Sequence, residues 1–583
     1  MIEKLFKLFS FLDKRKKFQL VLIIILMLLS SIAEMFSIGM VVPFLGAIAS
    51  PEVILENKYL LSLGLFDHNI NPEDILLPFT ILFIVITMIA ASVRLLLLFV
   101  TIRFSHAIGR ELGVDIFRKT MYQKYSCFVN ENSSDIINGV IVKVNTMTDK
   151  VIKPFLLILS SSLIMIGILS TLFYLNPLVA ASAFFCFGII YIFAIKVNHF
   201  KLRENSKLVA EHSSRMVKTL QEGLGGFRDV LIENSQEFYC DLYEKSNKKL
   251  RKALGDTTFI AASPRFIMEA LGISFIAILS LTLRTDNGID DIIPTLGALA
   301  LGAQRLLPIM QTLYDSISHI RGSESSLDDI LELLDKKLPF YALDKSSTPI
   351  EFANDILLDN ISFRYSSDTP NVIKNINIKV VKGSKIGFIG ATGSGKSTII
   401  DIIMGLIEPS EGFMFVDNVK ITESNKHKWW KRVAHVPQDI YLSDNSIKEN
   451  IAFGQCKDEI SISRVTKAAK FAQIDRFINS LDKAYDTRIG EKGIMLSGGQ
   501  RQRIGIARAL YSDADLIIFD EATSALDNET EMKVMNSINK LDNVTIIMIA
   551  HRISTLRSCD FIYSLKNGEI DKVYQDGEIA NLI

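Results

Sequence analysis

The residues best suited to chemistry form a glycine-rich loop between an apolar strand and an apolar-periodic helix. The stretch GATGSGKS fits the pattern GxxxxGK[ST] in a strand–loop–helix setting. Glycines let backbone N–H groups surround phosphate oxygens, and the N-terminus of the next helix adds a favourable dipole. Lys396 is expected to reach the β and γ phosphates, and Ser397 to ligate Mg²⁺. The predicted nucleotide-binding residues are Gly390, Ala391, Thr392, Gly393, Ser394, Gly395, Lys396, Ser397 and Thr398.

Two acids follow a second apolar strand. In ADLIIFDEATSALD the strand ends in Asp520 and Glu521, and a buried parallel strand delivers such residues to the sheet edge where ligands bind. Asp520 is placed to hold the metal, and Glu521 to orient and deprotonate an attacking water. Without the phosphate loop these would be ordinary acids at a strand end, but with it they predict a hydrolytic site.

Between these motifs lies MLSGGQRQRIGIARAL, and LSGGQ is the signature of ATP-binding cassette (ABC) transporters. The soluble half resembles their nucleotide-binding domain, which implies ATP and Mg²⁺ as ligands. By this resemblance Tyr365 in ISFRY stacks on adenine and Gln438 in HVPQD contacts Mg²⁺. Asp527 ends a D-loop, and His551 in IAHR is a catalytic residue that contacts the γ phosphate. The signature residues that close on ATP are Ser497, Gly498, Gly499 and Gln500.

The elements that must position these residues fall into two parts. Long apolar runs crowd the first part, whereas the chain after about residue 338 alternates charged, glycine-rich and apolar stretches, as a soluble α/β domain does. The sequence predicts a six-helix α-helical transmembrane domain of ABC exporter type plus a cytoplasmic α/β P-loop nucleotide-binding domain. The expected boundaries are 1–325 for the transmembrane domain, 326–350 for a linker and 351–583 for the ATP-binding domain.

Six apolar segments are long enough to span the hydrocarbon core, which takes about 20 residues. Basic residues crowd the leading segment and the connections 103–150 and 196–256, so these parts and the N-terminus are expected in the cytoplasm. The first apolar run is expected to be an uncleaved membrane helix rather than a signal peptide. The predicted spans are 18–44, 75–102, 151–174, 177–197, 258–283 and 292–313.

One phosphate loop, one signature and six predicted spans make the chain resemble half of an exporter-type ABC transporter. The resemblance implies a homodimer with ATP held across an isologous interface. It also implies alternating access, in which ATP closes the cassettes and hydrolysis resets them. Helical extensions such as Lys201–Leu220 are expected to carry the tips near NENSSDIING and QEGLGGFRDV toward the soluble domain.

Three arginines lie within predicted spans, namely Arg94, Arg265 and Arg305. Counting about 1.5 Å per residue places all three between mid-membrane and the inner boundary. Intramembrane charges usually face a bundle interior or an aqueous cavity, so together they predict a basic chamber for a phosphate or pyrophosphate head group. Two alternatives stay open: Arg94 snorkels to the interface, or Arg265 pairs with Glu269 one helical turn away.

Short segments narrow the resemblance to one branch of exporters. They are NKYL and SL in the outer connection, PR in the fifth span, RLLP in the sixth and SSLDDI before the cassette. These resemble the bacterial lipid-linked oligosaccharide flippase of protein N-glycosylation. The resemblance implies ATP-driven flipping of a polyprenyl-pyrophosphate-linked oligosaccharide from the cytoplasmic to the periplasmic leaflet of the bacterial inner membrane. The outer segment ENKYLLSLGLF is expected either to meet a lipid tail in the interface or to cap the domain.

Composition and rival classes bound this interpretation. Lys plus Arg and Asp plus Glu both total 64, so no overall charge points to nucleic acid, and the six predicted spans exclude a soluble ATPase acting on it. Five scattered cysteines form no CxxC pair, which argues against a metal cluster or a disulfide framework. The alternatives are an exporter of another lipid, a glycolipid or a drug, and a non-transporting ABC regulator or channel. The regulator is disfavoured because the hydrolysis motifs look complete.

Overall fold

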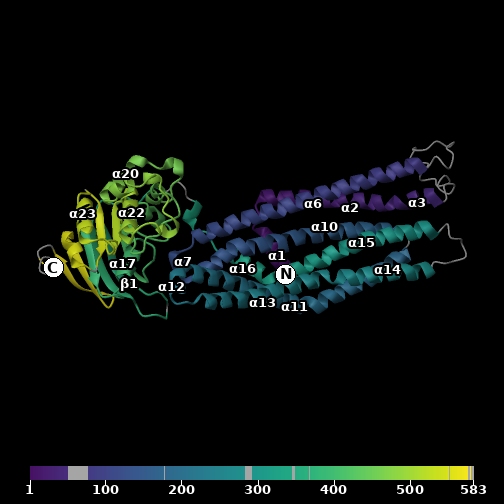
Figure 1. Cartoon of the computed structure of the whole chain (residues 1–583), viewed down its shortest axis with the longest axis horizontal. Helices are drawn as coiled ribbons and strands as arrows, with labels where there is room; N and C mark the ends of the chain where they lie inside the picture. Colours follow the sequence, from purple (N-terminus) through teal and green to yellow (C-terminus); the bar gives the residue numbers. More distant parts are fainter. Residues whose placement is uncertain are drawn as a thin grey trace. The chain divides into compact units, whose positions relative to one another are not determined.

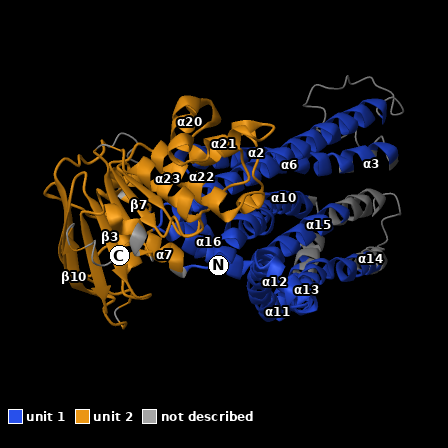
Figure 2. Cartoon of the chain, turned by 60° about the vertical axis from the view of Figure 1, so that its left-hand side comes forward, with its two compact units in different colours: residues 1–123, 130–337 blue, residues 124–129, 338–583 orange. Residues whose placement is uncertain are grey.

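The chain divides into two compact units (Figure 2). Unit 1 comprises Met1–Gln123 and Asn130–Lys337, and unit 2 comprises Lys124–Val129 and Leu338–Ile583. The domain boundaries expected from the sequence stay a prediction. The computed structural model describes residues 1–49, 76–175, 177–282, 292–343, 348–366, 368–541, 543–550, 552–575 and 578.

Unit 1 is helical throughout its described residues, and its long helices lie side by side (Figure 1). Helix α2 packs against α6 and α10, α10 also packs against α15, and α11 packs against α13. The elements are α1 Ile2–Ser10, α2 Lys14–Gly39, α3 Val41–Ala49, α6 Leu76–Met121, α8 Ser133–Ile137, π-helical η2 Asn138–Lys143, α9 Val144–Met147, π-helical η3 Thr148–Ile152, α10 Lys153–Leu175, α11 Pro177–Gly225, α12 Phe227–Ile232, α13 Gln236–Ala262, α14 Pro264–Thr282, α15 Ile292–Arg321 and α16 Glu324–Asp335.

The apolar character of these helices suits a membrane. Within the described part of the chain, three helical stretches are long and apolar enough to cross one, Lys14–Leu45, Leu76–Met121 and Ser133–Tyr174. Large apolar side chains of α6 point outward, among them Leu77, which is 68% exposed. A protein surrounded by water rarely exposes so many large apolar groups, so this surface fits a lipid environment.

Helix ends differ from the predicted spans in two places. The first predicted span is interrupted at Met40, where α2 ends and α3 follows. The fifth is interrupted at Ser263, because Pro264 lacks the N–H that would continue α13 and instead begins α14. The predicted helical extension through 201–220 is confirmed, since α11 is continuous to Gly225.

The N-terminal helix α1 is fastened to α16, the last helix of unit 1. Lys4 Nζ lies 3.0 Å from Glu324 Oε1 and 2.7 Å from Asp328 Oδ1, and Lys7 Nζ lies 2.6 Å from Asp335 Oδ2. Apolar side chains of both helices share one buried cluster beneath these pairs, so the ion pairs sit over an apolar seam. Its members from α1 and α16 are Leu5, Leu8, Leu327, Ile330, Leu331 and Leu334.

Unit 2 is an α/β unit with two sheets in its described residues. The larger sheet has the order β10-β9-β3-β8-β7-β6 and is parallel except for β10 against β9, whereas the smaller one, β2-β1-β4-β5, is antiparallel. The strands are β1 Asp355–Phe363, β2 Ile373–Val381, β3 Lys385–Gly390, β4 Glu411–Val416, β5 Val419–Lys420, β6 Val433–Val436, β7 Leu516–Asp520, β8 Thr545–Ile549, β9 Phe561–Lys566 and β10 Glu569–Gln575.

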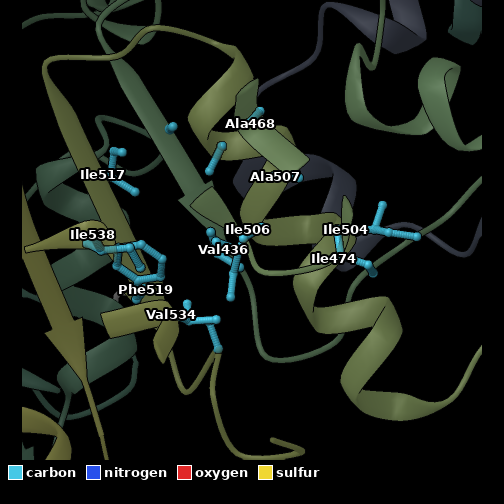
Figure 3. Packing of buried hydrophobic residues seen from close by; sticks show 14 of the residues in the cluster. Val436, Ala468, Ile474, Ile504, Ile506, Ala507, Ile517, Phe519, Val534 and Ile538 are labelled. Carbon is cyan, nitrogen blue, oxygen red and sulfur yellow. The ribbon is translucent and has the colours of Figure 1, made fainter. Parts of the chain in front are cut away.

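The helices of unit 2 cover the larger sheet. Figure 3 shows Ile506 of α22 beside Val436 of β6, and Ile504, two residues earlier on the same helix, beside Ile474. A second apolar cluster joins the two sheets around the strand and helix that flank the phosphate loop, β3 and α17. The α-helices are α7 Tyr125–Asn130, α17 Lys396–Ile403, α18 Lys426–Trp430, α19 Ile447–Ile451, α20 Ile462–Phe471, α21 Asp475–Asn479, α22 Gly498–Tyr511 and α23 Asn528–Ile538. The 3₁₀ turns are η4 Phe340–Leu343, η5 Lys457–Glu459, η6 Ala484–Asp486, η7 Glu491–Gly493 and η8 Ile553–Ser558.

The start of α19 carries a capping box that links unit 2 stability to pH. The hydroxyl of Ser446 accepts a hydrogen bond from the backbone N–H of Glu449, and the Glu449 side chain accepts one from Ser446 N. Hydrogen bonds from Ser446 and Lys457 lower the pKa of Glu449 from its ordinary 4.5 to about 2. A depressed folded-state pKa contributes stability that is complete above 4.5 and is lost as the pH falls toward 2.

Ser446→Ala is therefore expected to lower the free energy of unfolding by about 1 kcal/mol at pH 7. Because Glu449 then has a pKa nearer its ordinary value, the deficit should shrink as the pH falls from 4.5 toward 2. Thermal unfolding of the purified protein at both ends of this pH range measures the deficit. Ser461→Ala is the control, because Ser461 precedes α20 without a side-chain cap. An equal deficit at both pH values would contradict the assignment.

Candidate functional site

The phosphate loop lies between β3 and α17, as its spacing predicts. Gly390, Gly393 and Gly395 have φ values of 149°, 82° and 100°, which side-chain-bearing residues rarely adopt. A Cβ on Gly395 would collide with the side chain of Ile373, and one on Gly390 with the carbonyl of Leu565. The loop can therefore take this path only with glycine at these positions.

The polar groups of the loop suit a phosphate ligand. Lys396 Nζ donates to the carbonyls of Gly390 and Ala391 at 2.8 and 2.9 Å, so the ammonium is held over the loop. The buried Ser394 hydroxyl has no hydrogen-bond partner among the described residues, and such a group is expected to find one in a ligand. Ser397 is exposed in the first turn of α17, where the helix dipole favours an anion. The loop residues thus fit the phosphates of a nucleotide.

The acids lie where the sequence predicts, at the end of β7. Burial, together with the charge of Glu521, raises the pKa of Asp520. Glu521 follows with φ 51°, its backbone N–H bonded to Ile549 O at 3.0 Å, and Gln438 Nε2 donates to Glu521 Oε2 at 2.7 Å. Gln438 and Glu521 are therefore brought together. A divalent cation would relieve the repulsion between the two neighbouring acids, so this donor set fits Mg²⁺.

A third acid, Asp401, belongs to the same region and was missed from the sequence. It lies on α17, four residues after Ser397 and so on the same helix face. Burial, with a contribution from the charge of Asp520, raises the pKa of Asp401 to about 6. Its negative charge also raises the pKa of Tyr125 on α7, after the larger effect of burial. The spacing from Ser397 was the available signal.

Helix α7 is part of unit 2 although it precedes the rest of that unit by more than two hundred residues. Lys124 Nζ lies 3.3 Å from Glu423 Oε2, and Tyr125 lies near enough to Asp401 and Tyr365 to feel their charges. These residues come just before the stretch NENSSDIING, which was expected to reach the soluble domain. A short helix from the first long connection is thus seated beside the nucleotide-site residues of unit 2.

The remaining predicted nucleotide residues lie on separate elements. Tyr365 is 64% exposed, meets Phe363 edge-on at 5.0 Å, and its hydroxyl lies 3.2 Å from Thr398 Oγ1. Its ring is thus available beside the first turn of α17. Thr392 lies in the exposed part of the loop, and His551 lies outside the described residues.

The signature opens α22 with its own capping box. Ser497 N donates to Gln500 Oε1 at 2.8 Å, and Gln500 N donates to Ser497 Oγ at 3.3 Å. A Cβ on Gly498 would lie 3.4 Å from Ala525 Cβ, and one on Gly499 would lie 3.2 Å from Ala525 O. The two glycines thus pack closely against Ala525 at the start of α22. The N-terminus of α22 is, like that of α17, a helix end that favours an anion.

In unit 1 a cavity of about 570 Å³ lies among α2, α6, α10 and α15. Two of the three predicted arginines line it, Arg94 of α6 and Arg305 of α15, together with an acid that the sequence interpretation overlooked, Glu34 of α2. A lone acid in an apolar run was as strong a signal as the arginines. Polar lining also comes from Thr87, Thr101, Ser160, Ser161 and Thr312.

The third arginine is placed elsewhere. Arg265, in the first turn of α14, is not among the residues that line this cavity, and its side chain is 63% exposed. Its Nε donates to Glu269 Oε1 at 2.7 Å, the pairing kept open as an alternative. The structure therefore brings together Arg94 and Arg305 but not Arg265.

Gly395→Ala is expected to lower the affinity for ATP about tenfold or more. The side chain adds a left-handed backbone penalty of about 1–2 kcal/mol to a collision inside the loop. Gly383→Ala is the control, because Gly383 also has positive φ, 78°, but no atom lies within 4 Å of the added Cβ. Equilibrium binding of a fluorescent ATP analogue to both variants makes the comparison, and equal losses would contradict the loop assignment.

Comparisons with known proteins agree with this division. Residues 17–285 match the protein family described as the ABC transporter transmembrane region, and residues 373–524 match the family described as ABC transporter. An ATP-dependent lipid A-core flippase of Paraburkholderia xenovorans (strain LB400) is 28% identical over 489 residues, covering 81% of this chain and 80% of its own. One from Idiomarina loihiensis is 29% identical over 452 residues, covering 75% of each chain.

The fold is also that of a solved exporter. A bacterial Atm1-family ABC exporter with ATP bound superimposes with a TM-score of 0.78 at 20% identity, covering 98% of this chain and 97% of its own. This chain therefore has a helical transmembrane domain and an α/β nucleotide-binding domain, as predicted. One unit of each kind is half a transporter, and this implies a dimer. The chain belongs to the ABC transporters, as a multi-pass membrane half-transporter of the exporter type with an ATPase unit.

Proposed function

We propose that this protein uses ATP to flip an anionic lipid across the bacterial inner membrane, and that the lipid is a polyprenyl-pyrophosphate-linked oligosaccharide used in protein glycosylation. The observation that carries the proposal is the cavity of unit 1, where guanidinium groups from α6 and α15 meet among apolar helices. The relatives named as lipid A-core flippases support a lipid cargo. The short segments shared with the oligosaccharide flippase support the finer choice.

Arginine suits such a cargo. The guanidinium is planar, stays charged and matches phosphate oxygens in pairs. The lining also includes Leu95, Leu97, Leu98, Ile164 and Ile309, so one wall accepts aliphatic groups while the arginines accept an anion. The other candidate, an exporter of a different lipid, a glycolipid or a drug, would use the apolar wall and gain little from the charges.

The ATPase unit supplies the energy in this proposal. Ser397, Gln438 and Asp520 would hold Mg²⁺, which would supply positive charge against the phosphates. Lys396 contacts the β and γ phosphates, and the loop N–H groups surround them. Glu521, whose carboxylate accepts a hydrogen bond from Gln438, orients the attacking water and takes its proton. His551 contacts the γ phosphate, and the partner chain's signature closes the site.

Glu521→Gln is expected to bind ATP with unchanged affinity but to hydrolyse it about a hundredfold more slowly or worse, because a positioned general base contributes roughly 10²–10⁴ in rate. Phosphate release and ATP-analogue binding by the purified protein separate the two effects. The control is Glu529→Gln, since Glu529 is an exposed acid of α23 that pairs with Lys533. Wild-type turnover in Glu521→Gln would refute the assigned base.

The cargo is tested in vesicles that contain the protein, ATP and a fluorescent lipid-linked oligosaccharide. Replacing Arg94 and Arg305 together by alanine is expected to lower flipping about tenfold or more, since a hydrogen bond to a charged group contributes about 1.5–3 kcal/mol. Basal ATP hydrolysis should persist. Arg110→Ala is the control, because Arg110 is an exposed arginine of α6 that does not line this cavity. Arg265→Ala tests separately whether the third predicted arginine contributes.

Two results would contradict the proposal. One is undiminished flipping by the folded double variant, because the chamber would then have no part in transport. The other is ATPase stimulation by apolar compounds that does not depend on the arginines, which would favour the drug exporter.

A further inference from the structure

Glu34 is the buried acid on which the two cavity arginines converge. Its side chain is 4% exposed, whereas those of Arg94 and Arg305 are 51% and 35% exposed. Arg305 Nη1 donates to Glu34 Oε1, and Arg94 Nη1 lies 4.0 Å from the same oxygen. One carboxylate oxygen of α2 therefore holds guanidinium groups from α6 and α15.

Burial makes this carboxylate depend on its partners. An isolated ionised carboxyl in an apolar interior is costly, and two guanidinium groups compensate it. Each guanidinium has five N–H donors, so pairing with one oxygen leaves donors of both arginines available to the cavity. The charged residues of the lining are these three, and their formal charges sum to +1.

Three of the five hydroxyl groups of the lining already donate to carbonyls of their own helices. Thr87 Oγ1 donates to Phe83 O at 2.8 Å, Thr312 Oγ1 to Pro308 O at 2.8 Å, and Ser160 Oγ to Leu157 O at 3.2 Å. Their hydrogens are directed into their own helices, so these oxygens face the cavity as acceptors. An anion entering the cavity is therefore expected to bind mainly through the two guanidinium groups, whose positive charge Glu34 already partly compensates.

We infer that Glu34 is an internal substitute for the anionic group of the cargo: it occupies the arginine pair and competes with the phosphate of the lipid for it. This inference rests on the proposed function and specifies the cargo further. A single negative charge competes poorly with a carboxylate that is already in place, whereas a pyrophosphate carries more charge and can reach both guanidinium groups. The competition therefore selects lipids with a di- or polyanionic head group and assists their release.

The test compares three probes that share one tail, farnesyl pyrophosphate, farnesyl monophosphate and farnesol, binding to the full-length protein in lipid nanodiscs. Wild-type protein is expected to prefer them in that order. In Glu34→Gln the competing charge is gone, so both phosphates should bind about tenfold more tightly. The ratio between pyrophosphate and monophosphate affinities should fall, and ATP hydrolysis stimulated by farnesyl pyrophosphate should slow because release is slower.

Two variants serve as controls. Glu269→Gln removes the acidic partner of Arg265, which lies outside this cavity, and should leave all three affinities unchanged. Glu34→Asp keeps the charge but withdraws it by one methylene, so it should tighten phosphate binding less than Glu34→Gln does. Should Glu34→Gln fail to fold, the sign of the change in Glu34→Asp decides the question.

The outcomes separate the two proposals. If wild-type protein does not distinguish farnesyl pyrophosphate from farnesol, and alanine at Arg94 and Arg305 changes nothing, the proposed function fails. If the phosphate preference exists and depends on the arginines, but folded Glu34→Gln binds phosphates equally or more weakly, only the inference is overturned. Glu34 would then merely position the arginines, since a positioning role predicts weaker binding on its loss.

Discussion

The turn from β3 into α17 is the constraint on which the nucleotide site depends. Three glycines with positive φ take the chain around a tight path, and added side chains at Gly390 and Gly395 would collide with other parts of unit 2. Because β3 lies in the middle of the parallel sheet, between β8 and β9, the turn is held from both sides. Asp520 ends the strand beyond β8, so one sheet edge gathers the phosphate loop and the acids that are predicted to bind the metal.

Charge placement in the membrane unit follows a different physical rule. In unit 2 water and ligands can compensate the acids, whereas in unit 1 helices must compensate one another. Glu34 and its two arginines do this across three helices, and Arg265 does it within one helix turn through Glu269. The first arrangement creates a cavity with a net charge, and the second satisfies itself locally. This difference explains why only the former is the basis of a transport hypothesis.

Sequence reasoning succeeded where the determinants are local. The phosphate loop and the acids after β7 are short motifs whose flanking strands and helices follow from apolar patterning. It also placed Arg94 and Arg305 in one chamber, but it missed Glu34, because its pairing with Arg305 joins positions 271 residues apart. The helix break at Ser263 was not predicted, because the apolar sequence continues across Pro264. The only sign of the break in the sequence is the proline, which lacks a backbone N–H. Asp401 was missed because the phosphate-loop motif ends at Ser397, whereas helix α17 continues to Ile403.

The attachment of α1 to α16 has a mechanical consequence. Helix α16 ends at Asp335 and unit 2 resumes at Leu338, while only Phe11, Leu12 and Asp13 separate α1 from α2. Exposed ion pairs are weak and screened by salt, so the apolar seam beneath them carries most of the hold. Helix α1 thus links α16 to α2 through a connection of only three residues. A displacement of α16 is passed to the start of the first long helix without travelling through the rest of the bundle.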